Sequence, residues 1–189
     1  MTIWIILGLA AALAAYAVLI YNRLVSTRQM TEEAWSGIDV QLKRRSDLIP
    51  NLVDTVKGYA AHERGVFEQV TQLRTAAQNV PSGDVAARAK AEGALSAALG
   101  RLLAVAENYP DLKASVNFLE LQRELSTLEN EIQMARRYYN GATRNLNTMV
   151  ESFPSNIVAS QFKFEQREYF EIENAAERAV PQVSCEPKV

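Results

Sequence analysis

A cluster of charged residues between positions 39 and 47 is the part of the chain with the clearest potential for chemistry. It contains Asp39, Lys43, Arg44, Arg45 and Asp47. If this segment is helical, Asp39 can pair with Lys43 and Arg44 with Asp47, each pair stabilising the helix by about 0.2–0.5 kcal/mol. The three consecutive cations could instead bind anionic lipid or an acidic protein surface.

Arg45 also lies on an apolar seam of the same segment. Two charged residues, Arg45 and Glu63, occupy positions of this seam, and its apolar members are Trp35, Ile38, Leu42, Ile49, Leu52, Val56, Tyr59, Val66, Val70, Leu73 and Ala77. A buried charge without a partner is costly, so each must pair with an opposite charge on a neighbouring helix or contact another molecule. We favour pairing within the protein for Arg45. Lys43, Arg44, Arg45 and Glu63 are the candidate interaction residues.

Residues suited to catalysis or metal binding are scarce. His62 is the single histidine; no Glu precedes it by three residues, and Val66 stands where a zinc-protease motif needs a second His. Cys185 is the single cysteine, so no intrachain disulfide can form, and it has no nearby His in the sequence. Glycine-rich phosphate loops and nucleophile motifs are also missing from the sequence. We expect no catalytic, cofactor-binding or metal-binding residues and no enzymatic activity.

The first 22 residues form the expected membrane anchor. The run from Thr2 to Ile20 is uncharged, and the first charged side chain is Arg23. About 20 apolar residues are needed to cross a bilayer as a helix. The region before the run lacks basic side chains, which argues against a cleaved signal peptide. Because Arg23 and Arg28 follow the run, we expect a single-pass protein of the cell (inner) membrane with its short N-terminus outside and its domain in the cytoplasm.

Three long helical segments are expected after the anchor. Turn signals at 79–84, 109–111 and 153–155 divide the chain into helices over about 28–79, 84–108 and 112–152, with Ser82 or Asp84 capping the second and Asp111 the third. The third carries a heptad seam, typical of long helices packed lengthwise; its members are Phe118, Leu121, Leu125, Leu128, Ile132, Ala135, Tyr139, Ala142, Leu146, Met149 and Phe153.

Two features of the first segment leave alternatives open. Pro50 could kink the helix or reverse it into a hairpin; the seam stays in phase across Pro50, which favours a kinked rod. Thr31 followed by Glu32 and Glu33 resembles a helix start, so the anchor and the rod could be separate helices. The second segment is shorter than its neighbours, so the tail from Asn156 to Glu177 or a second subunit must cover part of the long seams.

Much of the chain resembles the LemA family of bacterial membrane proteins. The matching residues are Glu33 to Val53, Val56 to Glu63, Ala106 to Leu112, Ala135 to Asn140, Glu151 to Asn156, Phe162 and Tyr169-Phe170. The resemblance implies an N-terminal transmembrane helix with a short outer N-terminus and an antiparallel helical-bundle domain. It implies no established enzymatic activity, and a four-helix family fold would add weight to a hairpin at Pro50 or to a helical tail.

The expected architecture is all-α: a transmembrane anchor at 1–22, an elongated antiparallel bundle at 23–165 with three long helices and a short C-terminal helical segment, and a partly irregular tail at 166–189. The expected function is a membrane-anchored scaffold or interaction protein of the cell envelope. Its partners are the lipid bilayer, other proteins not identified by the sequence and, in a homo-oligomer, further copies of the chain. The net charge of −2 does not favour nucleic acid. An anionic-lipid or protein binder acting through Lys43–Arg45, or an unrecognised enzyme, is the alternative.

Overall fold

The protein is an elongated helical bundle joined to a long N-terminal helix. The structure, a computed structural model, describes residues 1–81 and 83–171, and its regular elements there are all α-helices. In chain order these are α1 (Thr2–Lys57), α2 (Arg64–Gln78), α3 (Val85–Ala106), α4 (Pro110–Lys113), α5 (Val116–Glu151) and α6 (Ser155–Gln161). The expected all-α class is therefore confirmed.

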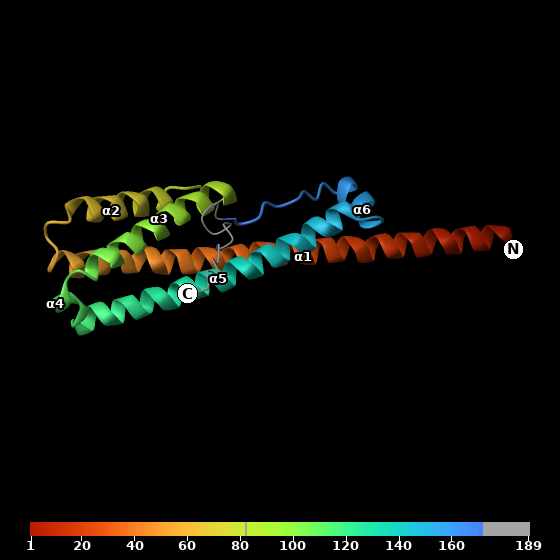
Figure 1. Ribbon diagram of the computed structural model, residues 1–189. Helices are drawn as coiled ribbons and strands as arrows, with labels where there is room; N and C mark the ends of the chain where they lie inside the picture. The colour runs from red at the N-terminus through yellow and green to blue at the C-terminus, as the bar shows by residue number, and fades with distance from the viewer. Residues whose placement is uncertain (82, 172–189) are drawn as a thin grey trace, which may run out of the picture.

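Figure 1 shows how these helices are arranged. The two longest, α1 and α5, run antiparallel and side by side, whereas α2 and α3 lie against the half of α1 that is far from the N-terminus. The short α6 closes the opposite end of the bundle, and the N-terminal part of α1 extends alone beyond it.

The first helix is continuous through both positions at which a break was considered. It contains 56 residues, or about 84 Å at 1.5 Å per residue, with Pro50 inside it. Thr31 does not start a new helix, because its buried hydroxyl donates to the Thr27 carbonyl at 2.9 Å within the same helix. Leu48, Ile49 and Leu52 around the proline are buried, and this packing offsets the cost of the missing backbone donor. The prediction that the helix continues as a rod through Pro50, and does not reverse into a hairpin there, is confirmed.

The predicted single segment 28–79 is wrong, because the chain turns at residues 58–63. Gly58 caps α1, and the amide of Ala60 donates to the Val56 carbonyl at 2.9 Å, which places Ala60 in the core. Tyr59, assigned to the seam, is instead 47% exposed. The additional helix expected of a four-helix family is therefore α2. It begins at Arg64, after this turn, and not at Pro50.

The other predicted breaks lie close to their observed positions. Asp84 caps α3, its carboxylate accepting from the Ala87 amide at 2.8 Å. Asp111 does not cap the third long helix; it lies in the first turn of the intervening α4, and Ser115 precedes α5 as its N-cap residue. Pro110 at the first position of α4 favours this extra turn, because its missing amide is not needed there.

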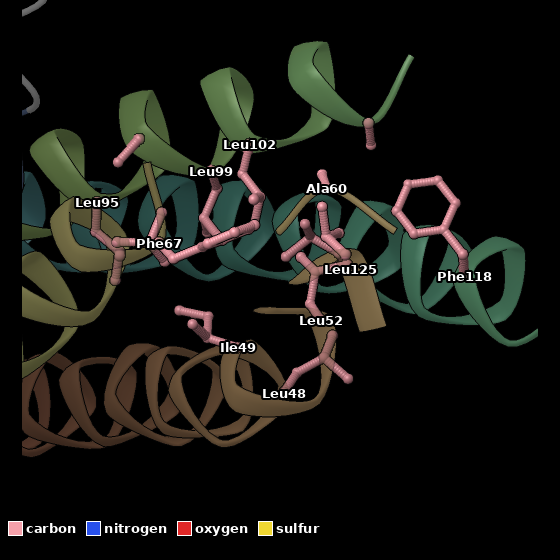
Figure 2. Packing of buried hydrophobic residues seen from close by; sticks show 14 of the residues in the cluster. Leu48, Ile49, Leu52, Ala60, Phe67, Leu95, Leu99, Leu102, Phe118 and Leu125 are labelled. Atoms are coloured by element: carbon pink, nitrogen blue, oxygen red, sulfur yellow. The ribbon is translucent and has the colours of Figure 1, made fainter. Parts of the chain in front are cut away.

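Within the described residues, the buried side chains form three clusters along the rod. In the largest, Leu48, Ile49 and Leu52 of α1 face Leu95, Leu99 and Leu102 of α3, with Phe67 of α2 and Leu125 of α5 beside them (Figure 2). The second joins α1 to α5 near Ile38 and Tyr139, and the third surrounds Leu24. The α5 seam packs as predicted except at its end, where Phe153 is 80% exposed because α5 stops at Glu151.

The segment after α6 covers part of α5, as the tail prediction required. Two asparagines of α5 hold its backbone: Asn147 both donates to the Arg167 carbonyl and accepts from the Arg167 amide, each at 2.9 Å. Asn140 pairs in the same way with Phe170, at 3.2 and 2.9 Å. The two asparagines are seven residues apart on a helix, and their partners are three residues apart in an extended segment. Both separations correspond to about 10 Å, so both asparagines can bind the segment at once. Phe164 and Phe170 are buried, whereas Ile172 and the rest of the tail lie outside the described residues.

Substitution of Asp84 tests whether its side chain stabilises the start of α3. We expect Asp84→Ala to lower the free energy of unfolding by about 0.5–2 kcal/mol, because the Ala87 amide loses its acceptor. Asp84→Asn keeps an acceptor oxygen and should lose little. Urea unfolding of the full chain in mild detergent, followed by circular dichroism, measures both; equal losses in the two variants would contradict the capping role.

Candidate functional site

Arg45 is at the centre of a buried charge cluster between α1, α3 and α5. Its side chain is 1% exposed and pairs with the carboxylate of Glu92 on α3, which is 5% exposed. One Nη atom also donates to Glu129 Oε1 of α5 and to Ser96 Oγ of α3, each at 2.6 Å. Pairing of Arg45 with carboxylates on neighbouring helices is therefore what the structure shows.

Arg88 extends the cluster back to the first helix. Its Nε donates to Glu92 Oε1 at 3.0 Å, and its Nη2 to Asp39 Oδ1 of α1 at 3.1 Å. Glu92 thus receives one arginine on each carboxylate oxygen. We call Asp39, Arg45, Arg88, Glu92, Ser96 and Glu129 the Arg45 cluster. It fixes the relative position of three helices, because each charge is matched by partners from a different part of the bundle.

Two open clefts flank the Arg45 cluster. One of about 310 Å³ is bordered by Arg45, Glu92, Glu129 and Phe170, and another of about 300 Å³ by Asp39, Arg88, Gln78 and Lys43. Both volumes are large enough for water or a small polar molecule. Each cleft is lined by two basic and two acidic side chains, so neither offers a surplus of one sign to a charged ligand.

A smaller cleft of about 110 Å³ lies nearer the anchor, beside Trp35 and Tyr139. The Tyr139 hydroxyl donates to the Glu168 carbonyl at 2.9 Å, and the Trp35 and Tyr139 ring centroids are 5.4 Å apart. Burial raises the pKa of Tyr139 above its ordinary value, and the nearby Thr143 hydroxyl and Arg167 guanidinium oppose this shift. Tyr139 is therefore a neutral structural hydrogen-bond donor at physiological pH.

The structure separates the four candidate interaction residues. Lys43 is exposed and pairs with Asp47 at 3.3 Å, and Arg44 pairs with Glu131 of α5 at 2.8 Å. The predicted pairs Asp39–Lys43 and Arg44–Asp47 are wrong, because Asp39 and Arg44 find partners on neighbouring helices. Glu63 lies away from this group, at the start of α2, and is half-buried.

Sequence reasoning missed the acidic partners of Arg45. A signal for Glu92 was present: it lies three residues from Ala89 and from Leu95, both buried, so it shares the buried face of α3. Glu129 and Ser96 carried no comparable signal, because polar residues are common on exposed helix faces. Among the described residues no group of acidic, His and Cys side chains could hold a metal ion, and Cys185 lies beyond those residues.

Comparison with known proteins places this architecture in a family. A sequence profile of the LemA family matches residues 34–185, which is most of the chain. The chain belongs to the LemA family. The match starts in α1 after the apolar part, so it rests on the bundle and its following segment.

Individual LemA-family relatives are distant in sequence. Magnetosome protein MamQ 2 of Paramagnetospirillum magneticum is 27% identical over 184 residues, covering 85% of this chain and 68% of the relative. Protein LemA of Metamycoplasma hominis is 29% identical over 140 residues, covering 74% and 64%. Magnetosome protein MamQ of Magnetospirillum gryphiswaldense is 24% identical over 189 residues, covering 86% and 70%.

The LemA-family chain is anchored in the membrane by the first part of α1. Of the described helices, α1 alone is long and apolar enough to span a bilayer, with a mean hydropathy of 2.5 in its most apolar stretch. None of the side chains in that stretch is buried by the rest of the protein. An uncovered helix surface this apolar suits the hydrocarbon core of a bilayer.

Proposed function

We propose that this protein is a membrane-anchored scaffold of the cell envelope, which holds an interaction surface at a fixed distance from the bilayer and performs no catalysis. The observation that carries the proposal is the continuity of α1, a single helix from the apolar anchor to the far tip of the bundle at Lys57. A continuous helix transmits position and orientation, whereas a linker would not.

The charge distribution supports an interaction role over a chemical one. Arg45 and Glu92, the most buried charged groups of the part that the structure describes, neutralise each other and join helices. Such a network favours one arrangement of the bundle, because Arg45 and Arg88 each pair with a carboxylate on another helix. Orientation is part of the proposal: Arg23 and Arg28 after the span favour a cytoplasmic bundle with the short N-terminus outside.

Exposed apolar side chains on α5 provide a surface for self-association. Met134 and Tyr138 are each 54% exposed and lie one helical turn apart, so their side chains share a face. Large apolar side chains are enriched at protein interfaces. We therefore propose a second copy of the chain as a partner on this face.

Binding of anionic lipid through Lys43–Arg45 has less support. Arg45 is enclosed by the bundle, and Lys43 and Arg44 each face a carboxylate. The segment Lys43–Arg45 also lies about 35 Å along α1 from the end of the predicted anchor at Asn22. Screening reduces attraction over distances beyond about 8–10 Å at physiological salt.

Measuring the mass of the full chain in mild detergent by light scattering tests the self-association proposal. We expect a multiple of the 21.0 kDa chain for the unchanged protein and a single chain for the double variant Met134→Glu/Tyr138→Glu, because two buried like charges oppose association. Val116→Glu is the matched control: Val116 is 67% exposed at the far tip, and its variant should keep the larger mass. A single-chain mass for the unchanged protein would contradict self-association.

A further inference from the structure

The end of the bundle that carries α6 packs directly on the helix that enters the membrane. Leu24 of α1 is completely buried by Ala159 of α6 and by Phe164, with Ile20 and Val25 packed around them. The ring centroids of Tyr21 and Phe162 are 4.7 Å apart. The α5–α6 end therefore lies at the level of residues 20–25 of α1, where its apolar run ends.

This end of the bundle also exposes large apolar side chains. Phe153 is 80% exposed, Ile157 60% and Phe162 58%; we call these three residues the α6 patch. The eleven residues from Ser152 to Phe162 include no charged residue, and Glu151 and Lys163 flank them. Single exposed apolar residues are ordinary, but three within an uncharged segment indicate a contact with another apolar phase.

The length of the free part of α1 determines where the bilayer surface must lie. Residues from Thr2 to Leu19 have almost no contact with the bundle, and Ile20 is the first to pack on the α6 end. These 18 residues span about 27 Å, close to the roughly 30 Å hydrocarbon core. A bilayer that covers all of this apolar helix must therefore extend to the end of the bundle that carries α6, where the free part of α1 begins (Figure 1).

The polar groups around the α6 patch suit a membrane surface. Arg23, Arg28 and Lys163 lie at this level, and the Arg28 guanidinium carbon is 5.2 Å from the Phe164 ring centroid. Aromatic rings beside basic side chains are characteristic of the headgroup region, where the ring meets acyl chains and the cation meets phosphate. Glu151 and Glu165 are also exposed here, so the fit depends on the apolar side chains more than on net charge.

We propose that the α6 patch is a second membrane contact, in which Phe153, Ile157 and Phe162 insert into the interfacial region of the bilayer that α1 spans. The occupant of this surface is lipid, because the patch continues the apolar surface of the anchor at the same level. Two contacts at different points fix the tilt and rotation of the bundle relative to the membrane, which a single spanning helix leaves free. This proposal does not depend on which side of the membrane the bundle lies.

Site-specific fluorescence on the full chain in vesicles of phosphatidylethanolamine and phosphatidylglycerol tests this contact. An environment-sensitive label is placed at Ile157→Cys or, as the matched control, at Val116→Cys, both in a Cys185→Ser background. Both positions are exposed, so neither change removes core packing; circular dichroism verifies equal helicity. We expect the label at 157 to be quenched by a nitroxide attached near the lipid headgroup and to show a several-fold smaller iodide quenching constant than the label at 116.

Two results would overturn the proposal. Equal access of iodide to both labels would mean that the α6 patch is in water. Protection of the label at 157 from iodide without quenching by the lipid nitroxide would mean that protein, such as a second copy of the chain, covers the patch. Neither result depends on the mass measured for the self-association test.

Discussion

Arg45→Met should lower the free energy of unfolding of the full chain by about 3–5 kcal/mol, because it removes the cation from a buried pair and leaves Glu92 inside the bundle with Arg88 as its remaining charged partner. The methionine retains much of the volume and apolar stem of the arginine, so the loss reports charge more than packing. Urea unfolding in mild detergent at neutral pH, followed by circular dichroism, measures it.

Two further variants separate the buried charge from its surroundings. Arg45→Met/Glu92→Leu should recover most of the loss, since a buried ion pair replaced by apolar residues is often neutral or stabilising. Lys43→Met removes an exposed cation two positions away and should change stability by about 0–1 kcal/mol. A loss below about 1 kcal/mol in Arg45→Met would show that the Arg45 cluster does not hold the bundle together.

Phe170→Ala should destabilise the protein by about 3–5 kcal/mol, the usual cost of truncating a buried aromatic side chain. The Phe170 ring lies 6.0 Å from that of Trp35, and the Arg136 guanidinium carbon is 5.4 Å from its centroid. The truncation would leave a cavity between α1, α5 and the segment after α6. Its effect on unfolding is measured in the same urea experiment.

The neighbouring tyrosine is the control for Phe170. Tyr169 is 40% exposed, and Tyr169→Ala should change the free energy of unfolding by no more than about 0.5 kcal/mol. If both variants lost the same small amount, the segment 164–170 would not be an integral part of the bundle. A large loss confined to Phe170→Ala would show that the domain requires this non-helical segment.

Local sequence signals determined most of the helices correctly. The uncharged run before Arg23, the heptad spacing of α5 and the Asp84 cap depend on residues close together in the chain, which explains why they could be interpreted without a structure. Pro50 was also interpreted correctly, because the apolar residues on both sides remain in one helical phase and their packing outweighs one lost backbone bond.

The turn after Lys57 was missed for an equally local reason. The seam appeared to continue through Tyr59 and Val66, because apolar residues of two different helices happened to follow one spacing. Only the packing of Ala60 against the core, and of Phe67 opposite α3, shows that the chain has turned back. Periodicity cannot distinguish one long helix from two shorter ones that keep the same phase.

The sequence by itself determined that this chain has a membrane anchor, an all-helical rod and an arginine on an apolar seam, where it needs partners. The tertiary structure decided which partners these are: Glu92, Glu129 and Ser96 are 47, 84 and 51 residues from Arg45 along the chain. It also decided that the uncharged segment around Ile157 lies beside the end of the anchor. The physical reason is the same in both cases. Local backbone geometry fixes which residues share one face of a helix, whereas contacts between helices depend on how the whole chain packs.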